Sequence, residues 1–297
     1  MNTLSEKEKN AIGEALGEYI KKYQSQNKAV ESLSGVSVGT VSHIVRGIYE
    51  NISDEMFRSI AVQITPKIAD EWQYVETYCY KEIVTALEDA KKYRIKRWIV
   101  GEAGCGKSTS ANIYAKEHKN VFVILCDEDM KKGDFVREIA KKMGIKTAGL
   151  RIRDVLDACM ENLIQMESPL LVFDEGDKLN DNVFHYFINI YNRLEDKCGI
   201  VFLSTDYIKH RIQTGLRYNK KGYNEIHSRI GRRFFELEEI RKSDVYSVCR
   251  ANGLENEEDI LKVIGEIAKE DSKKTTGSYD LRSVYDTVHK IKRLKRA

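Results

Sequence analysis

Residues 101–108 have the types and the spacing of a loop that binds the phosphates of a nucleotide. They read G-E-A-G-C-G-K-S and follow the apolar run at 98–100. Glycines at this spacing let the backbone bend until consecutive N–H groups point at phosphate oxygens. Lys107 would bring a positive charge to the outer phosphates, and Ser108 would bring a hydroxyl to Mg²⁺. The sequence therefore predicts a site for ATP and Mg²⁺, formed by Gly101, Glu102, Ala103, Gly104, Cys105, Gly106, Lys107, Ser108 and Thr109.

A second apolar run ends in two acids. Residues 170–173 are Leu-Leu-Val-Phe, and Asp174 and Glu175 follow directly. In α/β sheets, ligands bind at the carboxyl ends of the strands. We expect Asp174 to hold Mg²⁺ through water and Glu175 to orient or deprotonate the attacking water. Such a pair alone could be a solvated turn, but beside the phosphate loop it indicates hydrolysis of ATP to ADP and phosphate.

Strands and helices alternate from residue 94 onward and must position these groups. Apolar runs predict strands at 97–100, 121–126, 170–173, 200–203 and 234–237. Helical patterns fill the gaps at 107–118, 133–143, 152–166, 182–195 and 206–213. This alternation is typical of an α/β domain with a largely parallel sheet. The last part, 243–297, has no strand pattern and reads as three helices, which predicts a small C-terminal helical lid.

The N-terminal part reads as an all-α helix-turn-helix domain. A helical pattern covers 5–22, a second helix is expected at 28–33, and a third begins after the N-cap Ser37. Val38, Val41 and Val45 are expected to form the buried stripe of this third helix. Its opposite face would then contact DNA through Thr40, His43 and Arg46.

Charge leaves an alternative open for this domain. Residues 1–60 hold seven Lys/Arg and eight Asp/Glu, and affinity for DNA depends on neutralising phosphates. A small helical bundle that binds protein therefore remains possible. The basic surface is expected in the second half of the chain, because residues 204–250 hold eleven Lys/Arg against six Asp/Glu.

Composition excludes several other classes of protein. The 297 residues are 42% hydrophobic and 32% charged, as in ordinary soluble globular proteins. No apolar run is long enough to span a bilayer, and the polar first residues are not a signal peptide, so we expect a cytoplasmic location and no membrane partner. The six cysteines are scattered without a C-x-x-C pair, which favours reduced thiols over disulfides or zinc ligands.

The acid pair at 174–175 resembles that of the AAA+ ATPases, and further positions extend the resemblance. In that family a polar residue after the next strand senses the γ-phosphate, and Thr205 takes this place, where many relatives have Asn. An arginine before the last strand reaches the site of a neighbouring subunit. Arg229 fits best, and Arg232 and Arg233 are alternatives. The segment 277–282 is similar to the family's lid sensor, which implies that Arg282 touches the γ-phosphate in cis. Each arginine could instead be an ordinary surface or DNA-facing charge.

A narrower resemblance covers nearly the full chain. Its characteristic parts are E-S-L-S-G-V-S-V-G-T-V-S at 31–42, D-E-G-D-K-L at 174–179 and H-S-R-I at 227–230. They are similar to the transposition ATPases of the phage Mu group, which capture target DNA. The resemblance implies a homo-oligomer or filament on double-stranded DNA, little sequence preference, and delivery of that DNA to a transposase.

DNA would then lie along basic loops, at Lys131, Lys132, Lys209, Arg211, Arg217, Lys220 and Lys221, unless these are only a solvated face. The predicted domains are a helix-turn-helix domain at 1–65, a helical linker at 66–93, an AAA+ core at 94–240 and a lid at 241–297. Two other functions stay open: an ATP-switched helix-turn-helix transcriptional regulator and a helicase-loader-like ATPase.

Overall fold

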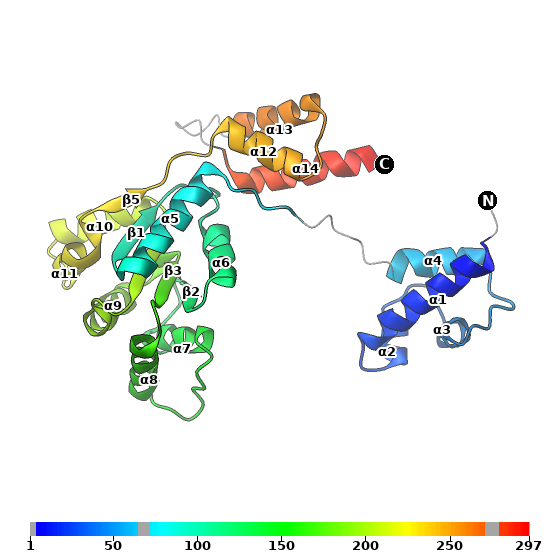
Figure 1. Cartoon of the computed structure of the whole chain (residues 1–297), viewed down its shortest axis with the longest axis horizontal. Coiled ribbons are helices and arrows are strands. Elements are labelled where there is room, and N and C mark those ends of the chain that lie inside the picture. Colours follow the sequence, from blue (N-terminus) through cyan, green and yellow to red (C-terminus); the bar gives the residue numbers. More distant parts are fainter. Residues whose placement is uncertain (1–3, 65–71, 271–278, 297) are drawn as a thin grey trace. The chain divides into compact units, whose positions relative to one another are not determined.

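The computed structural model describes residues 4–64, 72–270 and 279–296. The chain divides into two compact units, Met1–Trp72 and Gln73–Ala297. Each unit has its own hydrophobic core. Figure 1 shows the helices and strands of both units. Among the described ranges, no helix combines the length and the apolar character that crossing a bilayer requires.

The first unit is all-α, as the sequence predicts. It contains α1 (Glu6–Lys21), α2 (Gln26–Glu31), α3 (Val38–Val45) and α4 (Asp54–Ile64). The first three helices each begin after a serine whose hydroxyl accepts a hydrogen bond from a backbone N–H three residues on. Buried side chains of all four helices form one small core, including Leu16, Val30, Val41, Ile44 and Phe57.

The buried face of α3 differs from the expected stripe. Val41 and Ile44 are at most 1% exposed, whereas Val38 and Val45 are 44% and 45% exposed. The helix packs on a line between positions 41 and 44, and its eight residues are too few to bury a wider stripe. The expected burial of Val38 and Val45 is therefore wrong.

A five-stranded parallel sheet organises the second unit. Its strands are β1 (Lys96–Val100), β2 (Val121–Leu125), β3 (Leu170–Asp174), β4 (Gly199–Ser204) and β5 (Phe234–Glu236), in the order β2-β3-β4-β1-β5. The register pairs Val100 with Ser204 and Asp174 with Leu203, so β1, β3 and β4 end at one edge. The predicted α/β P-loop class is confirmed.

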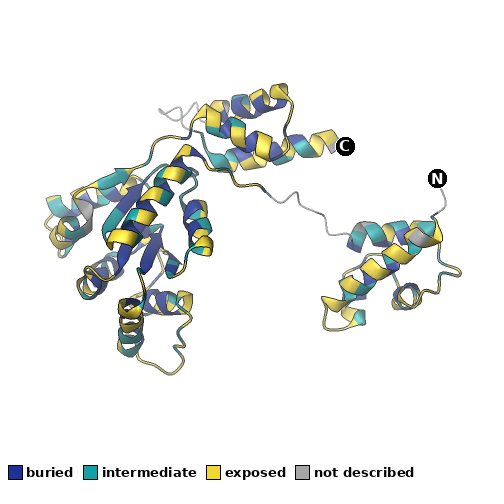
Figure 2. Ribbon diagram, viewed as in Figure 1, coloured by how far each residue is buried: buried dark blue, intermediate teal, exposed yellow. Residues whose placement is uncertain are grey.

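Helices cover both faces of this sheet, which explains why its central strands are apolar throughout (Figure 2). One face packs against side chains of α7 (Lys132–Lys142), α8 (Ile152–Gln165), α9 (Asp181–Leu194) and α10 (Tyr207–Arg217). The other face packs against α5 (Tyr78–Tyr93) and α6 (Lys107–Glu117). The range expected to be a helical linker, 66–93, thus includes α5, whose buried side chains belong to the core of the sheet.

Three helices follow the sheet: α12 (Lys242–Ala251), α13 (Glu257–Glu270) and α14 (Leu281–Arg296). Their apolar faces meet through Val245, Ile260, Val263, Val284 and Val288, all fully buried. Contacts with α5 tie this bundle to the rest of the unit, since the Tyr78 N–H donates to Asp244 Oδ1 at 3.1 Å.

Candidate nucleotide site

The loop between β1 and α6 has the backbone that the glycine spacing predicts. Gly104 and Gly106 have φ values of +80° and +95°, a region that other residues rarely adopt. Gly101 is needed for space, because a Cβ there would lie 2.8 Å from Leu237 Cδ1. The loop ends where α6 begins at Lys107, which places a helix N-terminus behind it.

Lys107 and Ser108 open α6 and reach opposite ends of the site. Lys107 Nζ donates to the carbonyl oxygens of Gly101 and Glu102, both at 2.7 Å, and thus spans the loop. The Ser108 hydroxyl hydrogen-bonds the Asp174 carboxylate at the end of β3. The two residues predicted to hold Mg²⁺ therefore meet. Their oxygen donors suit a hard cation of this kind.

Asp174 is the most deeply buried acid of the site, with 3% exposure. Burial raises its pKa, while the hydrogen bond from Ser108 partly opposes that rise. The following residue, Glu175, has φ of +56°, and its N–H donates to Asp174 Oδ1 at 3.1 Å. The Glu175 carboxylate forms an ion pair with Lys178, whose Nζ lies 2.6 Å from Glu175 Oε2.

Thr205 follows β4 and contacts an acid that the sequence analysis did not select. Its Oγ1 donates to Asp177 Oδ2 at 2.8 Å. Beneath it, the Trp98 indole Nε1 donates to Ser204 Oγ at 2.6 Å inside the core. The spacing D-E-G-D at 174–177 was the available signal for Asp177, because a short turn after β3 returns the fourth residue to the sheet edge.

The predicted arginines lie in different surroundings. Arg229 forms an ion pair with Glu225 at 2.9 Å and lies over the Tyr191 ring at 5.6 Å. Arg232 and Arg233 are exposed. Arg282 is exposed on the first turn of α14, and residues 277–278 of its motif lie outside the described residues.

The start of α14 itself contacts the phosphate loop. The Leu281 N–H donates to the Gly104 carbonyl at 3.1 Å. A Cβ on Gly104 would lie 1.9 Å from Asp280 Oδ1, so glycine is required here by its neighbour as well as by its φ. Asp280 also accepts the N–H of Arg282 at 2.8 Å. The segment 277–282 was the available signal for this contact, but it pointed to Arg282 and not to Asp280.

Two buried thiols meet under the loop. The Cys79 thiol donates to the Glu238 carbonyl at 2.8 Å and lies beside Cys105. This neighbour lowers the pKa of Cys105 to about 6, and Lys107, with Nζ 3.6 Å from Cys105 Sγ, adds to the effect. The pKa of Cys79 is raised by the same contact and by burial.

The basic residues predicted to contact DNA divide into three groups. Lys131, Arg217 and Lys221 are exposed. Lys132 lies over the Tyr186 ring and Lys220 lies 3.8 Å from Asp181. Lys209 pairs with Asp206 and Glu236 at 3.1 and 2.9 Å.

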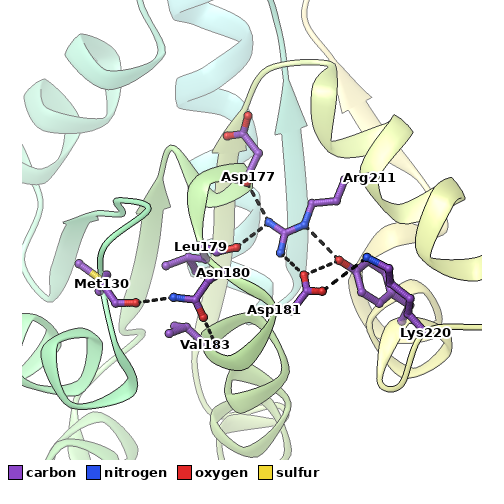
Figure 3. Close-up of polar contacts among 9 residues, drawn as sticks. Met130, Asp177, Leu179, Asn180, Asp181, Val183, Arg211 and Lys220 are labelled. Atoms are coloured by element: carbon purple, nitrogen blue, oxygen red, sulfur yellow. Dashed lines mark hydrogen bonds and ion pairs between the residues drawn. The ribbon is translucent and has the colours of Figure 1, made fainter.

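The prediction for Arg211 needs correction. Its side chain is only 14% exposed and its guanidinium points into the protein, toward the turn after β3 (Figure 3). All three nitrogens are engaged by protein acceptors there. Arg211 is thus a structural residue of the second unit and not a surface contact for phosphates.

One family model matches part of this unit. Residues 98–212 match the model described as "AAA domain". The parallel sheet and the loop between β1 and α6 agree with a P-loop fold of this type.

The resemblance to transposition B proteins is also confirmed over most of the chain. The chain is 25% identical to "Mu-like prophage FluMu DNA transposition protein B" of Haemophilus influenzae, over 80% of this chain and 83% of that protein. It is 22% identical to "ATP-dependent target DNA activator B" of Escherichia phage Mu, over 88% and 84%. Among solved structures, Aeropyrum pernix Orc1 in complex with DNA has 15% identity and a TM-score of 0.48, covering 76% of this chain and 68% of that chain.

Proposed function

We propose that the chain binds and hydrolyses ATP, assembles on duplex DNA and delivers that DNA to a transposase. One observation carries the proposal: Lys107, Ser108, Asp174 and Glu175 converge at one edge of the sheet, with Ser108 and Asp174 in direct contact. The similarity to proteins named for transposition and for target DNA activation supports the DNA-directed part.

The residues would divide the work of hydrolysis among them. Lys107 would exchange its two carbonyl acceptors for oxygens of the outer phosphates, as an ammonium with three donors can. Ser108 and Asp174 would hold Mg²⁺, which supplies charge neutralisation at the phosphates. Glu175 would orient or deprotonate the attacking water once its contact with Lys178 is released. Thr205 would hydrogen-bond the γ-phosphate.

Assembly would add groups from a neighbouring copy. Arg229, or its neighbours Arg232 and Arg233, would reach the γ-phosphate of the adjacent protomer, and Arg282 would act within its own site. Because such an arginine loses its partner when the γ-phosphate leaves, hydrolysis would weaken the contact between protomers.

DNA binding would be mainly electrostatic. The candidate contacts are the lysines and the arginine that the structure leaves at the surface: Lys131, Lys132, Lys209, Arg217, Lys220 and Lys221. In the first unit, α3 presents Thr40, His43 and Arg46 for the same purpose. Contacts of this kind tolerate any sequence and weaken steeply with salt.

Electron microscopy and ATPase assays with random duplex DNA, with and without ATP, test the proposal. We expect ATP-dependent filaments for the wild type and neither filaments nor turnover for Lys107→Ala. Glu175→Gln should bind ATP and form filaments but stall hydrolysis. Lys116→Ala is the matched control, since Lys116 is an exposed lysine of the same helix. Filaments of Lys107→Ala with ATP would refute the proposal.

A second candidate is an ATP-switched transcriptional regulator. The exposed His43 and Arg46 on α3 favour it, because a helix-turn-helix module can read one operator. A regulator should prefer one sequence and lose that preference in His43→Ala and Arg46→Ala. Uniform affinity for random duplexes, falling steeply with salt, supports the filament protein instead. A helicase-loader-like ATPase would be favoured by binding to a replicative helicase without filaments on DNA.

A further inference from the structure

Arg211 lies at the centre of a polar cluster beside the turn that follows β3 (Figure 3). From α10, its Nη1 donates to the backbone carbonyls of Asp177 and Leu179 at 2.9 and 2.6 Å. Its Nη2 donates to Asp181 Oδ1 at 2.7 Å, and its Nε donates to the Tyr223 hydroxyl at 3.1 Å. Four hydrogen bonds from one planar group fix a position more firmly than single contacts do.

The backbone that Arg211 holds belongs to the catalytic turn, defined here as residues 175–180. This turn carries Glu175 at one end and the Asp177 carboxylate that accepts from Thr205. Two of its carbonyls, two residues apart, accept from one guanidinium. The other side of the turn is fixed by Asn180, whose Nδ2 donates to the Met130 carbonyl at 2.7 Å.

The cluster is also built into the packing of α10. Tyr223 from α11 (Tyr223–Ile226) lies so close to Gly215 of α10 that a Cβ there would be 2.1 Å from its ring. The Tyr223 hydroxyl donates to Asp181 Oδ1 at 2.7 Å, so Asp181 accepts from both Arg211 and Tyr223. Glycine at 215 thus permits the close approach that completes the cluster.

We propose that Arg211 is a positioning residue for ATP hydrolysis: it holds the catalytic turn so that Glu175 and the Asp177–Thr205 pair stay in place. The inference rests on the proposed ATPase activity. Arg211 itself does not reach the nucleotide site, so its loss should lower turnover and leave ATP binding largely intact. A displacement of about 1 Å in a catalytic group can reduce a rate about 100-fold.

The test compares kcat, KM and ATP dissociation constants for the full chain with DNA. Arg211→Ala should lower kcat about 10- to 100-fold and change the ATP dissociation constant less than about threefold. Tyr223→Phe keeps the ring and removes one hydroxyl, so it should lower kcat by a smaller factor. Arg193→Ala is the matched control, because it removes an arginine–aspartate pair between α8 and α9 that does not touch the turn.

Arg211→Lys and amide hydrogen exchange separate positioning from folding. One ammonium cannot reach two carbonyls and Asp181 together in the same fork, so Arg211→Lys should keep the fold and recover only part of kcat. Exchange at residues 175–180 should rise in Arg211→Ala and not in Arg193→Ala. A kcat within twofold of wild type in Arg211→Ala would overturn the inference. If Arg211→Ala does not fold, a kcat within twofold of wild type in both Arg211→Lys and Tyr223→Phe would overturn it. The inference would also be overturned if weaker ATP binding by Arg211→Ala accounted for its whole loss of turnover. If the wild-type chain has no ATPase activity, the proposed function is refuted instead. Amide hydrogen exchange at residues 175–180 would then still show whether Arg211 holds the catalytic turn.

Discussion

Ser204→Ala should destabilise the second unit, Gln73–Ala297, by about 2 kcal/mol. The Trp98 indole donates to Ser204 Oγ at 2.6 Å, and both residues are at most 2% exposed. Alanine leaves the indole N–H buried without an acceptor, and such a stranded donor costs about 1–3 kcal/mol because water cannot replace the lost partner. In a unit of this size the loss corresponds to a fall of about 4–8 °C in the thermal midpoint.

Calorimetry of the full chain measures this shift, and amide exchange at β1 and β4 locates it. Ser110→Ala is the matched control. Ser110 is equally buried and donates its hydroxyl to the Gly106 carbonyl at 2.9 Å, but that carbonyl also accepts the Ser110 N–H. Removing this hydroxyl strands no polar group, so we expect a change within about 0.5 kcal/mol. Equal shifts for the two variants would show that the buried indole donor does not carry the effect.

Three further predictions concern the nucleotide site. Because burial raises the pKa of Asp174, the folded chain holds its proton more tightly than the unfolded chain, and this stability is lost as pH rises through the raised pKa. Asp174→Asn should therefore stabilise the chain without nucleotide at neutral pH in calorimetry, while phosphate release stops. Unchanged stability would contradict this. Because its pKa is lowered to about 6, Cys105 should react with iodoacetamide before the other cysteines at neutral pH. The reaction of Cys105 should be slower below about pH 6, and slower when ATP is present. Peptide mass spectrometry measures the extent of reaction at each cysteine. Gly104→Ala should destabilise the unit and raise amide exchange at the start of α14, because the new Cβ meets Asp280. Gly149→Ala is the control, since Gly149 has a similar φ of +75° and no atom lies near the position of its Cβ. It should show only the backbone strain of about 1–2 kcal/mol.

Local sequence was sufficient to predict the sheet and the phosphate loop. The strands are buried on both faces and therefore read as continuous apolar runs, and the φ values of Gly104 and Gly106 require glycine whatever surrounds them. The contact between Ser108 and Asp174 could also be predicted, because parallel strands place their carboxyl ends at one edge. The DNA contacts, the arginine from a neighbouring copy and the magnesium site stay predictions.

Side-chain partners across the fold could not be predicted in this way. An arginine on an amphipathic helix such as α10 reads as a surface charge, and only the packing of Tyr223 and the catalytic turn shows that Arg211 points inward. The predicted buried stripe of α3 was wrong for the same reason. A helix this short could pack through more than one face, and only its neighbours decide which face is buried. Asp280 contacts the phosphate loop through the lid, about 180 residues away in sequence, where no spacing rule applies.

The polar groups of the site share a feature that bears on how ATP would act. Lys107 donates to backbone carbonyls, Glu175 pairs with Lys178, and Thr205 donates to Asp177. Under the proposed function, ATP binding exchanges the partners of Lys107 and Thr205 for phosphate oxygens, and that of Glu175 for the attacking water. Each exchange replaces one charge-assisted hydrogen bond by another, so its net free energy is small compared with either bond alone. When one phosphate is lost, the side chains of such a site return to their internal partners. A site of this kind suits a switch for assembly better than one whose side chains have no partners before ATP binds.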